Sequence, residues 1–148
     1  MEQRILIIED NTSNLELMIY LLQAFGYTLL TARSGEEGLE ILRREELQLV
    51  LCDISMVGMD GYEVARHLKA DPSLRTLPLV AVTALAMLGD CEHILATGFD
   101  GYIAKPIEPE TFVAQMQGFL GATAPPPVHV HDFQTPGEDE PGMADAGS

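Results

Sequence analysis

The chain has 148 residues, which suits one domain with a hydrophobic core. Its 23 acidic and 8 basic residues give a net charge of -15, which disfavours direct binding to nucleic acid or to anionic membranes. No apolar run is long enough to cross a bilayer or resembles a secretory signal, and neither cysteine belongs to a metal or redox spacing, so we expect a cytoplasmic protein.

The first predicted element is a strand at residues 4–8, a continuous apolar run that ends at Glu9 and Asp10. A helix is predicted over residues 12–25, with Gly26 placed to close it in a left-handed conformation. A second strand is predicted at residues 27–31. This first helix is more apolar than one buried face requires, which leaves part of its surface for contact with a partner.

The next helix opens with a predicted capping box, in which Ser34 caps the helix and Glu37 reaches back. A buried strand follows at residues 49–52 and ends in Asp53. A third helix is predicted from a second capping pattern at Asp60 and Glu63, and it runs to about residue 70.

The remaining elements repeat this alternation. An apolar strand at residues 79–82 ends in Thr83, a helix stops at Gly98, and a short strand at residues 102–104 is followed by Lys105. A last helix is predicted from Pro109. Five strands alternating with five helices predict an α/β fold, a doubly wound five-stranded parallel sheet with helices on both faces.

The composition changes from about residue 124, where prolines, glycines and acidic residues replace apolar ones. We therefore expect a folded domain over residues 1–123 and a disordered acidic tail over residues 124–148.

Polar groups suited to phosphoryl chemistry follow four of the five predicted strands: Glu9 with Asp10, then Asp53, Thr83 and Lys105. In a parallel sheet these strand ends meet at one edge. Three carboxylates within about 6 Å would repel by about 3–4 kcal/mol per pair, so protons or a cation must relieve them. Oxygen ligands of this kind suit Mg²⁺, and Asp53 could then act as an oxygen nucleophile towards phosphorus.

These motifs resemble the response regulator receiver domain, the CheY-like module of two-component signalling. The resemblance covers about residues 4–121 and rests on Glu9-Asp10, Asp53-Ile54-Ser55-Met56 with Met59-Asp60-Gly61, Val82-Thr83-Ala84 and Lys105-Pro106. It implies a flavodoxin-like fold with strand order 2-1-3-4-5. It also implies a single-domain response regulator that signals by protein contact or by phosphorelay, and that is no enzyme beyond slow self-dephosphorylation.

The resemblance implies that Asp53 is the phosphoacceptor and that the donor is a histidine kinase or a histidine phosphotransfer protein. Mg²⁺ would be held by Asp53, Asp10, the backbone carbonyl of Ser55 and, through a water, Glu9. Lys105 would neutralise the phosphoryl oxygens.

Two further residues match the switch positions of the family. The resemblance implies that the Thr83 hydroxyl moves towards the phosphoryl group and that Tyr102 rotates inward with it. Val57 departs from the pattern, because the family commonly has a proline there, and its presence predicts a looser loop after Asp53.

A docking patch for a helical histidine donor is predicted beside the site. It would combine Asn14 and Leu17, on a face of the first helix away from its core stripe, with Pro106 and Ile107. The alternative is that Leu17 is an isolated exposed leucine of the common kind.

Two other classes of protein share part of this pattern. An aspartate-nucleophile phosphatase of the haloacid dehalogenase type also uses Asp, Thr, Lys and Mg²⁺, but its nucleophile follows the first strand in a D-x-D pattern, where this chain has Ile8-Glu9-Asp10. A flavodoxin-like flavin carrier would need a phosphate loop rich in Ser, Thr and Gly after the first strand, which is absent here.

Overall fold

The computed structural model describes residues 3–85 and 87–120, so the predicted tail at 124–148 lies outside the described residues. Five parallel strands form one sheet in the order β2-β1-β3-β4-β5, which confirms the predicted α/β fold and its strand order. The strands are β1 (Arg4–Ile8), β2 (Thr28–Ala32), β3 (Leu49–Asp53), β4 (Leu79–Thr83) and β5 (Gly101–Ala104). The helices are α1 (Thr12–Ala24), α2 (Gly35–Arg44), α3 (Gly61–Ala70), α4 (Leu88–Thr97) and α5 (Pro109–Gln117).

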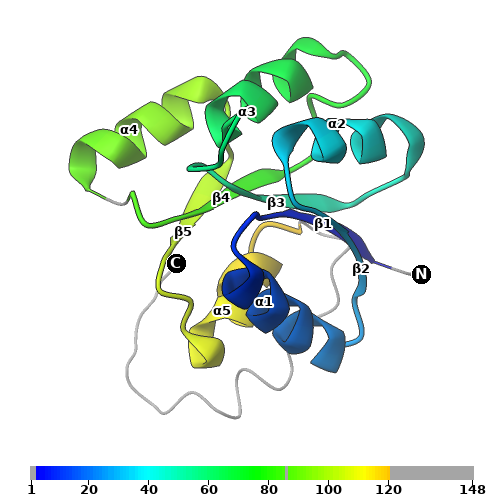
Figure 1. The fold of residues 1–148 in the computed structure, drawn as a ribbon, viewed down its shortest axis with the longest axis vertical. Helices are drawn as coiled ribbons and strands as arrows, with labels where there is room; N and C mark the ends of the chain where they lie inside the picture. Colours follow the sequence, from blue (N-terminus) through cyan, green and yellow to red (C-terminus); the bar gives the residue numbers. More distant parts are fainter. Residues whose placement is uncertain (1–2, 86, 121–148) are drawn as a thin grey trace.

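Helices cover both faces of the sheet, with α1 and α5 on one face and α2, α3 and α4 on the other (Figure 1). Successive strand side chains point to opposite faces, so Ile5 and Ile7 pack with α1 and α5, whereas Leu6 and Ile8 belong to the core on the other face. The strands β3 and β4 are buried along their whole length. This double burial explains why they read as continuous apolar runs.

Side-chain caps define where several helices begin. The Ser34 hydroxyl accepts a hydrogen bond from the Glu37 N–H, as predicted, but the Glu37 carboxylate accepts from the Arg33 N–H instead of from Ser34. Asp60 and Glu63 form the complete reciprocal capping box at the start of α3. No helix in the described ranges is long and apolar enough to span a membrane.

Candidate functional site

The predicted polar residues lie at one edge of the sheet. β3 ends with Asp53 and β4 with Thr83, while Glu9 and Lys105 directly follow β1 and β5. Backbone hydrogen bonds extend the pairing past the strand ends, because the Glu9 N–H donates to the Ala32 carbonyl at 3.0 Å and the Lys105 N–H to the Thr83 carbonyl at 2.8 Å. The parallel register therefore holds these residues beside one another.

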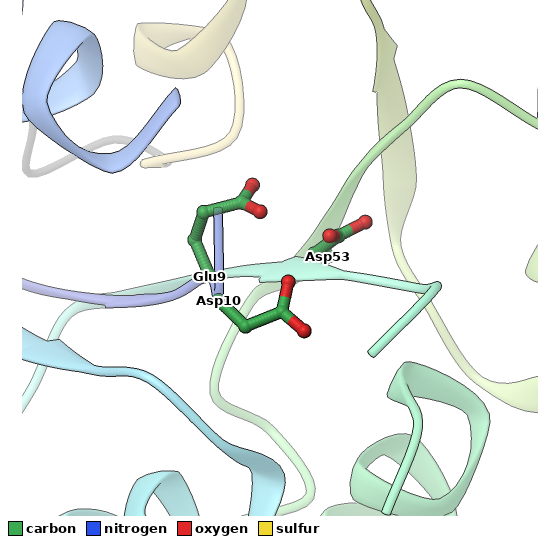
Figure 2. A group of neighbouring side chains, drawn as sticks. All are labelled: Glu9, Asp10 and Asp53. Atoms are coloured by element: carbon green, nitrogen blue, oxygen red, sulfur yellow. The ribbon is translucent and has the colours of Figure 1, made fainter. Parts of the chain in front are cut away.

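Three carboxylates converge at this edge. One oxygen from each of Glu9, Asp10 and Asp53 lies within 4.8 Å of the other two, and Figure 2 shows the three side chains gathered at the ends of β1 and β3. Glu9 is fully buried, Asp53 is 5% exposed and Asp10 is half-buried. The predicted acidic cluster is thus present, and two of its members are shielded from bulk water.

Lys105 supplies positive charge to the cluster. Its Nζ atom lies 3.1 Å from Glu9 Oε1 and 3.4 Å from Asp53 Oδ2, and its side chain is mostly buried. Such a buried lysine, held between two carboxylates, is positioned to neutralise additional negative oxygens that arrive at Asp53.

The carboxyl group of Glu9 is the most perturbed acid of the cluster. Its pKa is raised from 4.5 to about 7, mainly by burial and in addition by the contact with the Asp53 carboxyl and by its negative charge. Lys105 and the Asn11 N–H, which donates to Glu9 Oε2 at 3.1 Å, act in the opposite direction. Burial is the larger influence, so near neutral pH Glu9 takes up a proton readily when no metal is bound.

The donor atoms of this cluster fit a hard divalent cation. Although Glu9 Oε1 contacts Lys105 Nζ, it is a buried oxygen that makes no hydrogen bond within the described part of the chain. Carboxylate oxygens from three residues, one of them buried and lacking a hydrogen bond, are the ligands that Mg²⁺ prefers. The residues therefore fit the magnesium site that the sequence predicts.

The loop between β3 and α3 folds back over the acidic cluster. The Ser55 N–H donates to Asp53 Oδ1 at 3.3 Å, so the backbone of Ser55 lies beside this carboxylate. The Val57 N–H donates to Asp10 Oδ2 at 3.4 Å. The neck of the loop closes through the Gly61 N–H, which donates to the Ile54 carbonyl at 2.9 Å.

Thr83 and Tyr102 occupy different environments. Thr83 is buried, and its Oγ1 accepts a hydrogen bond from the Leu85 N–H at 2.8 Å. Tyr102 is 37% exposed, and its hydroxyl contacts the Cys91 side chain, which raises the pKa of the tyrosine. The structure therefore shows the tyrosine at the surface, between β5 and α4.

The predicted docking patch is only partly at the surface. Ile107 is 6% exposed and packs in the core with α1 and α5, so its predicted surface role is wrong for this conformation. Leu17 was expected on a face away from the core, but it is half-buried and packs against that same core. Asn14 is half-buried and Pro106 is exposed, and these two residues still offer surface next to the site.

Arg33 is a neighbour of the site that sequence reasoning missed. Its Nη2 donates to the Asp10 backbone carbonyl at 3.0 Å and to Thr12 Oγ1 at 2.7 Å. β2 was predicted to end at residue 31 but ends at Ala32, so Arg33 is the polar residue that directly follows the strand. Its position after a strand end was the available signal.

A buried aspartate, two acidic neighbours and a lysine lie together at the carboxyl edge of the sheet, where open α/β sheets bind their ligands. Residues 5–117 match the model of the response regulator receiver domain, and the chain belongs to this family. The match covers most of the chain and favours a signalling module over the phosphatase alternative.

Individual relatives are similar over nearly their whole length. The polar-differentiation response regulators DivK of Brucella ovis and Brucella suis are 40% identical over 121 residues, which cover 82% of this chain and 98% of theirs. A receiver domain of a histidine kinase from Syntrophus aciditrophicus is 31% identical, with a TM-score of 0.75 over 84% of this chain and 96% of its own.

A second solved structure bears on the metal. The receiver domain of a sensor histidine kinase from Pseudomonas aeruginosa, determined with a magnesium ion coordinated in its active-site cleft, is 30% identical with a TM-score of 0.75. The similarity covers 82% of this chain and 100% of that domain.

Proposed function

We propose that this receiver accepts a phosphoryl group on Asp53 from a phosphohistidine of a histidine kinase or a histidine phosphotransfer protein. The observation that carries the proposal is the contact of the buried Asp53 carboxylate with Lys105 at 3.4 Å, inside a cluster with Glu9 and Asp10. Signalling would follow through contacts with a downstream protein or through transfer of the phosphoryl group to a further histidine.

The chemistry is an in-line displacement at phosphorus. An oxygen of Asp53 forms the new bond to phosphorus while the phosphorus–nitrogen bond of the phosphohistidine breaks, and the leaving imidazole keeps the electron pair and gains a proton from water. Lys105 sits within reach of the transferred oxygens and can stabilise their negative charge. Later attack of water on the acyl phosphate would release inorganic phosphate, a slow self-dephosphorylation.

Mg²⁺ would be held by Asp10, Asp53 and the Ser55 carbonyl, with Glu9 acting through a water. Bound there, the metal would neutralise negative charge on the phosphoryl oxygens. The support for this ligand set is the three-carboxylate cluster of this chain and the magnesium ion in the cleft of the Pseudomonas aeruginosa relative.

The response to phosphorylation would begin at Thr83. Its oxygen accepts from Leu85, so its hydroxyl hydrogen can be donated to a phosphoryl oxygen on Asp53. Movement of Thr83 would vacate space above β4, and Tyr102, which lies at the surface of the neighbouring strand β5, would rotate into it.

The decisive experiment is incubation of the full chain with acetyl phosphate and Mg²⁺, followed by intact-mass measurement. We expect the native chain to gain the mass of one phosphoryl group and Asp53→Asn to gain none. Asp71→Asn, a control where α3 ends at the opposite edge of the sheet, should behave like the native chain. A cognate histidine donor should give the same result. If the native chain gains no phosphoryl group from either donor, the proposal is wrong.

A further inference from the structure

The backbone of Val57 carries an interaction that its side chain does not. The side chain is 89% exposed and so packs against little of the protein. Its N–H, however, donates to Asp10 Oδ2 at 3.4 Å across 47 positions of sequence. This contact joins the loop after β3 to the carboxylate that follows β1.

The loop is shaped so that this N–H faces Asp10. Its neck is closed by the hydrogen bond from the Gly61 N–H to the Ile54 carbonyl. Gly58, the residue after Val57, has a φ of +80°, a left-handed conformation that glycine adopts without strain. The position of the Val57 N–H therefore follows from the fold of the loop and does not depend on the valine side chain.

Asp10 is held at its backbone from the other direction, because Arg33 donates to its carbonyl at 3.0 Å. Because that contact is to the backbone, it does not restrict the rotation of the Asp10 carboxylate. In Figure 2, one oxygen of Asp10 is directed towards Asp53 and the other is directed away from it. A hydrogen bond to one oxygen restricts the rotation of this planar group and so favours one direction for the second oxygen.

We propose that the Val57 N–H is a positioning group for Asp10, which it holds in the orientation that binds Mg²⁺. The inference rests on the proposed function, since it assumes that Asp10 is a metal ligand. The proline expected at this position from the family resemblance has no N–H and could not donate this hydrogen bond. In this chain, therefore, valine adds a constraint on Asp10 in the loop where the sequence alone predicts a loss of rigidity.

The physical reason is electrostatic. Without a metal, the Asp10 carboxylate faces Asp53 within 4.8 Å, and rotation away from the cluster would relieve their repulsion. A hydrogen bond to an ionised carboxylate opposes that rotation. The Asp10 carboxylate is then oriented before the metal binds, so ordering it costs less free energy on binding.

The test compares Mg²⁺ affinity by isothermal titration calorimetry on the full chain. Val57→Pro removes the N–H. An amide-to-ester replacement at residue 57 also removes it but leaves the valine side chain in place. Val57→Ala is the control that retains the N–H. We expect the first two to weaken Mg²⁺ binding roughly threefold to tenfold and Val57→Ala to stay within about twofold of the native chain. Where proline and ester disagree, the ester decides, because proline also restricts the neighbouring backbone.

A spectroscopic readout separates positioning from a general loss of structure. In NMR spectra of the native chain, the amide resonance of Val57 should shift as Mg²⁺ is titrated. The same resonance should also differ between the native chain and Asp10→Asn, while resonances of the core strands stay in place in both comparisons. Native affinity in the ester, tighter binding in the ester, or a Val57 resonance that ignores both changes would overturn the inference. If the native chain itself binds no Mg²⁺, the proposed metal site fails instead, and the two failures are thereby distinguished.

Discussion

Glu9, Asp10 and Asp53 bring more negative charge to the sheet edge than Lys105 neutralises. Part of the difference is relieved by a proton, because burial and Asp53 raise the pKa of Glu9 to about 7. At the scale of single residues, a pKa near 7 leaves the Glu9 carboxyl partly protonated near neutral pH, and a bound cation would compete with that proton. Metal binding near neutral pH should therefore release, on average, less than one proton per molecule to the solvent.

The raised pKa of Glu9 predicts a pH-dependent stability of the metal-free protein. A group whose pKa is raised on folding contributes stability in full below its unfolded value, near 4.5, and loses it as the pH rises through about 7. Glu9→Gln, which cannot ionise, should lack this loss. In EDTA at about pH 8 its free energy of unfolding should exceed that of the native chain by on the order of 2 kcal/mol, and the advantage should shrink towards pH 5.

Urea unfolding of both chains at several pH values between these limits measures the effect. The difference between the two chains isolates Glu9, because all other titrating groups are shared. Parallel stability curves over the whole range would show that Glu9 keeps an ordinary pKa in the folded protein.

At the scale of elements, the close approach of α3 to the end of β3 positions the loop that carries Ser55 and Val57. A Cβ atom on Gly61, the first residue of α3, would lie 2.5 Å from the Asp53 carbonyl oxygen and 2.7 Å from the Ile54 Cα. Both are backbone atoms, which cannot move aside without displacing the strand end. Glycine is therefore required where the helix meets the phosphoacceptor strand.

Gly61→Ala should lower the free energy of unfolding by about 1–3 kcal/mol, because the added methyl group must push α3 away from β3. The same displacement should slow phosphorylation of Asp53 by acetyl phosphate. Gly89 is the matched control, since a Cβ there would meet no atom within 4 Å and the residue lies in α4. Gly89→Ala should be neutral or stabilising by up to about 1 kcal/mol. Equal unfolding midpoints for the two variants in urea would contradict the steric argument.

At the scale of the whole molecule, β3 runs through the middle of the sheet with a core on each face (Figure 1). Its residue Cys52 is fully buried beside Asp53, and burial raises the pKa of its thiol. A reagent can therefore reach this thiol only when the sheet opens. Cys52 reports on the stability of the strand that carries the phosphoacceptor.

In a Cys91→Ser variant, which leaves Cys52 as the remaining thiol, labelling by a disulfide reagent should be at least about 1,000-fold slower in buffer than in urea. Mg²⁺ should slow it further if the metal binds only the folded state. The rate is followed by absorbance of the released thiolate. Fast labelling in buffer would show that β3 opens locally, without unfolding of the rest.

Much of the molecule could be predicted from local pattern. Apolar runs of strand length gave β1, β3 and β4 within one residue, and capping patterns gave the starts of α2 and α3. Convergence of Asp53 with the other strand-end residues followed from a general property of parallel sheets. The boundaries of the elements are harder to predict: β2 lies one residue further along the chain than the sequence predicts. For that reason Arg33, which contacts Asp10, was not recognised as a residue that follows a strand.

The alternation of elements, the acidic cluster and its lysine could all be predicted from the amino-acid order, because they depend on periodicity and on the chemistry of single side chains. Three features required the folded structure: the burial of Ile107, the raised pKa of the Glu9 carboxyl and the contact of the Val57 N–H with Asp10. These features arise from contacts between segments distant in sequence. Burial, and with it the pKa and the partner of each polar group, exists only once those segments are packed together.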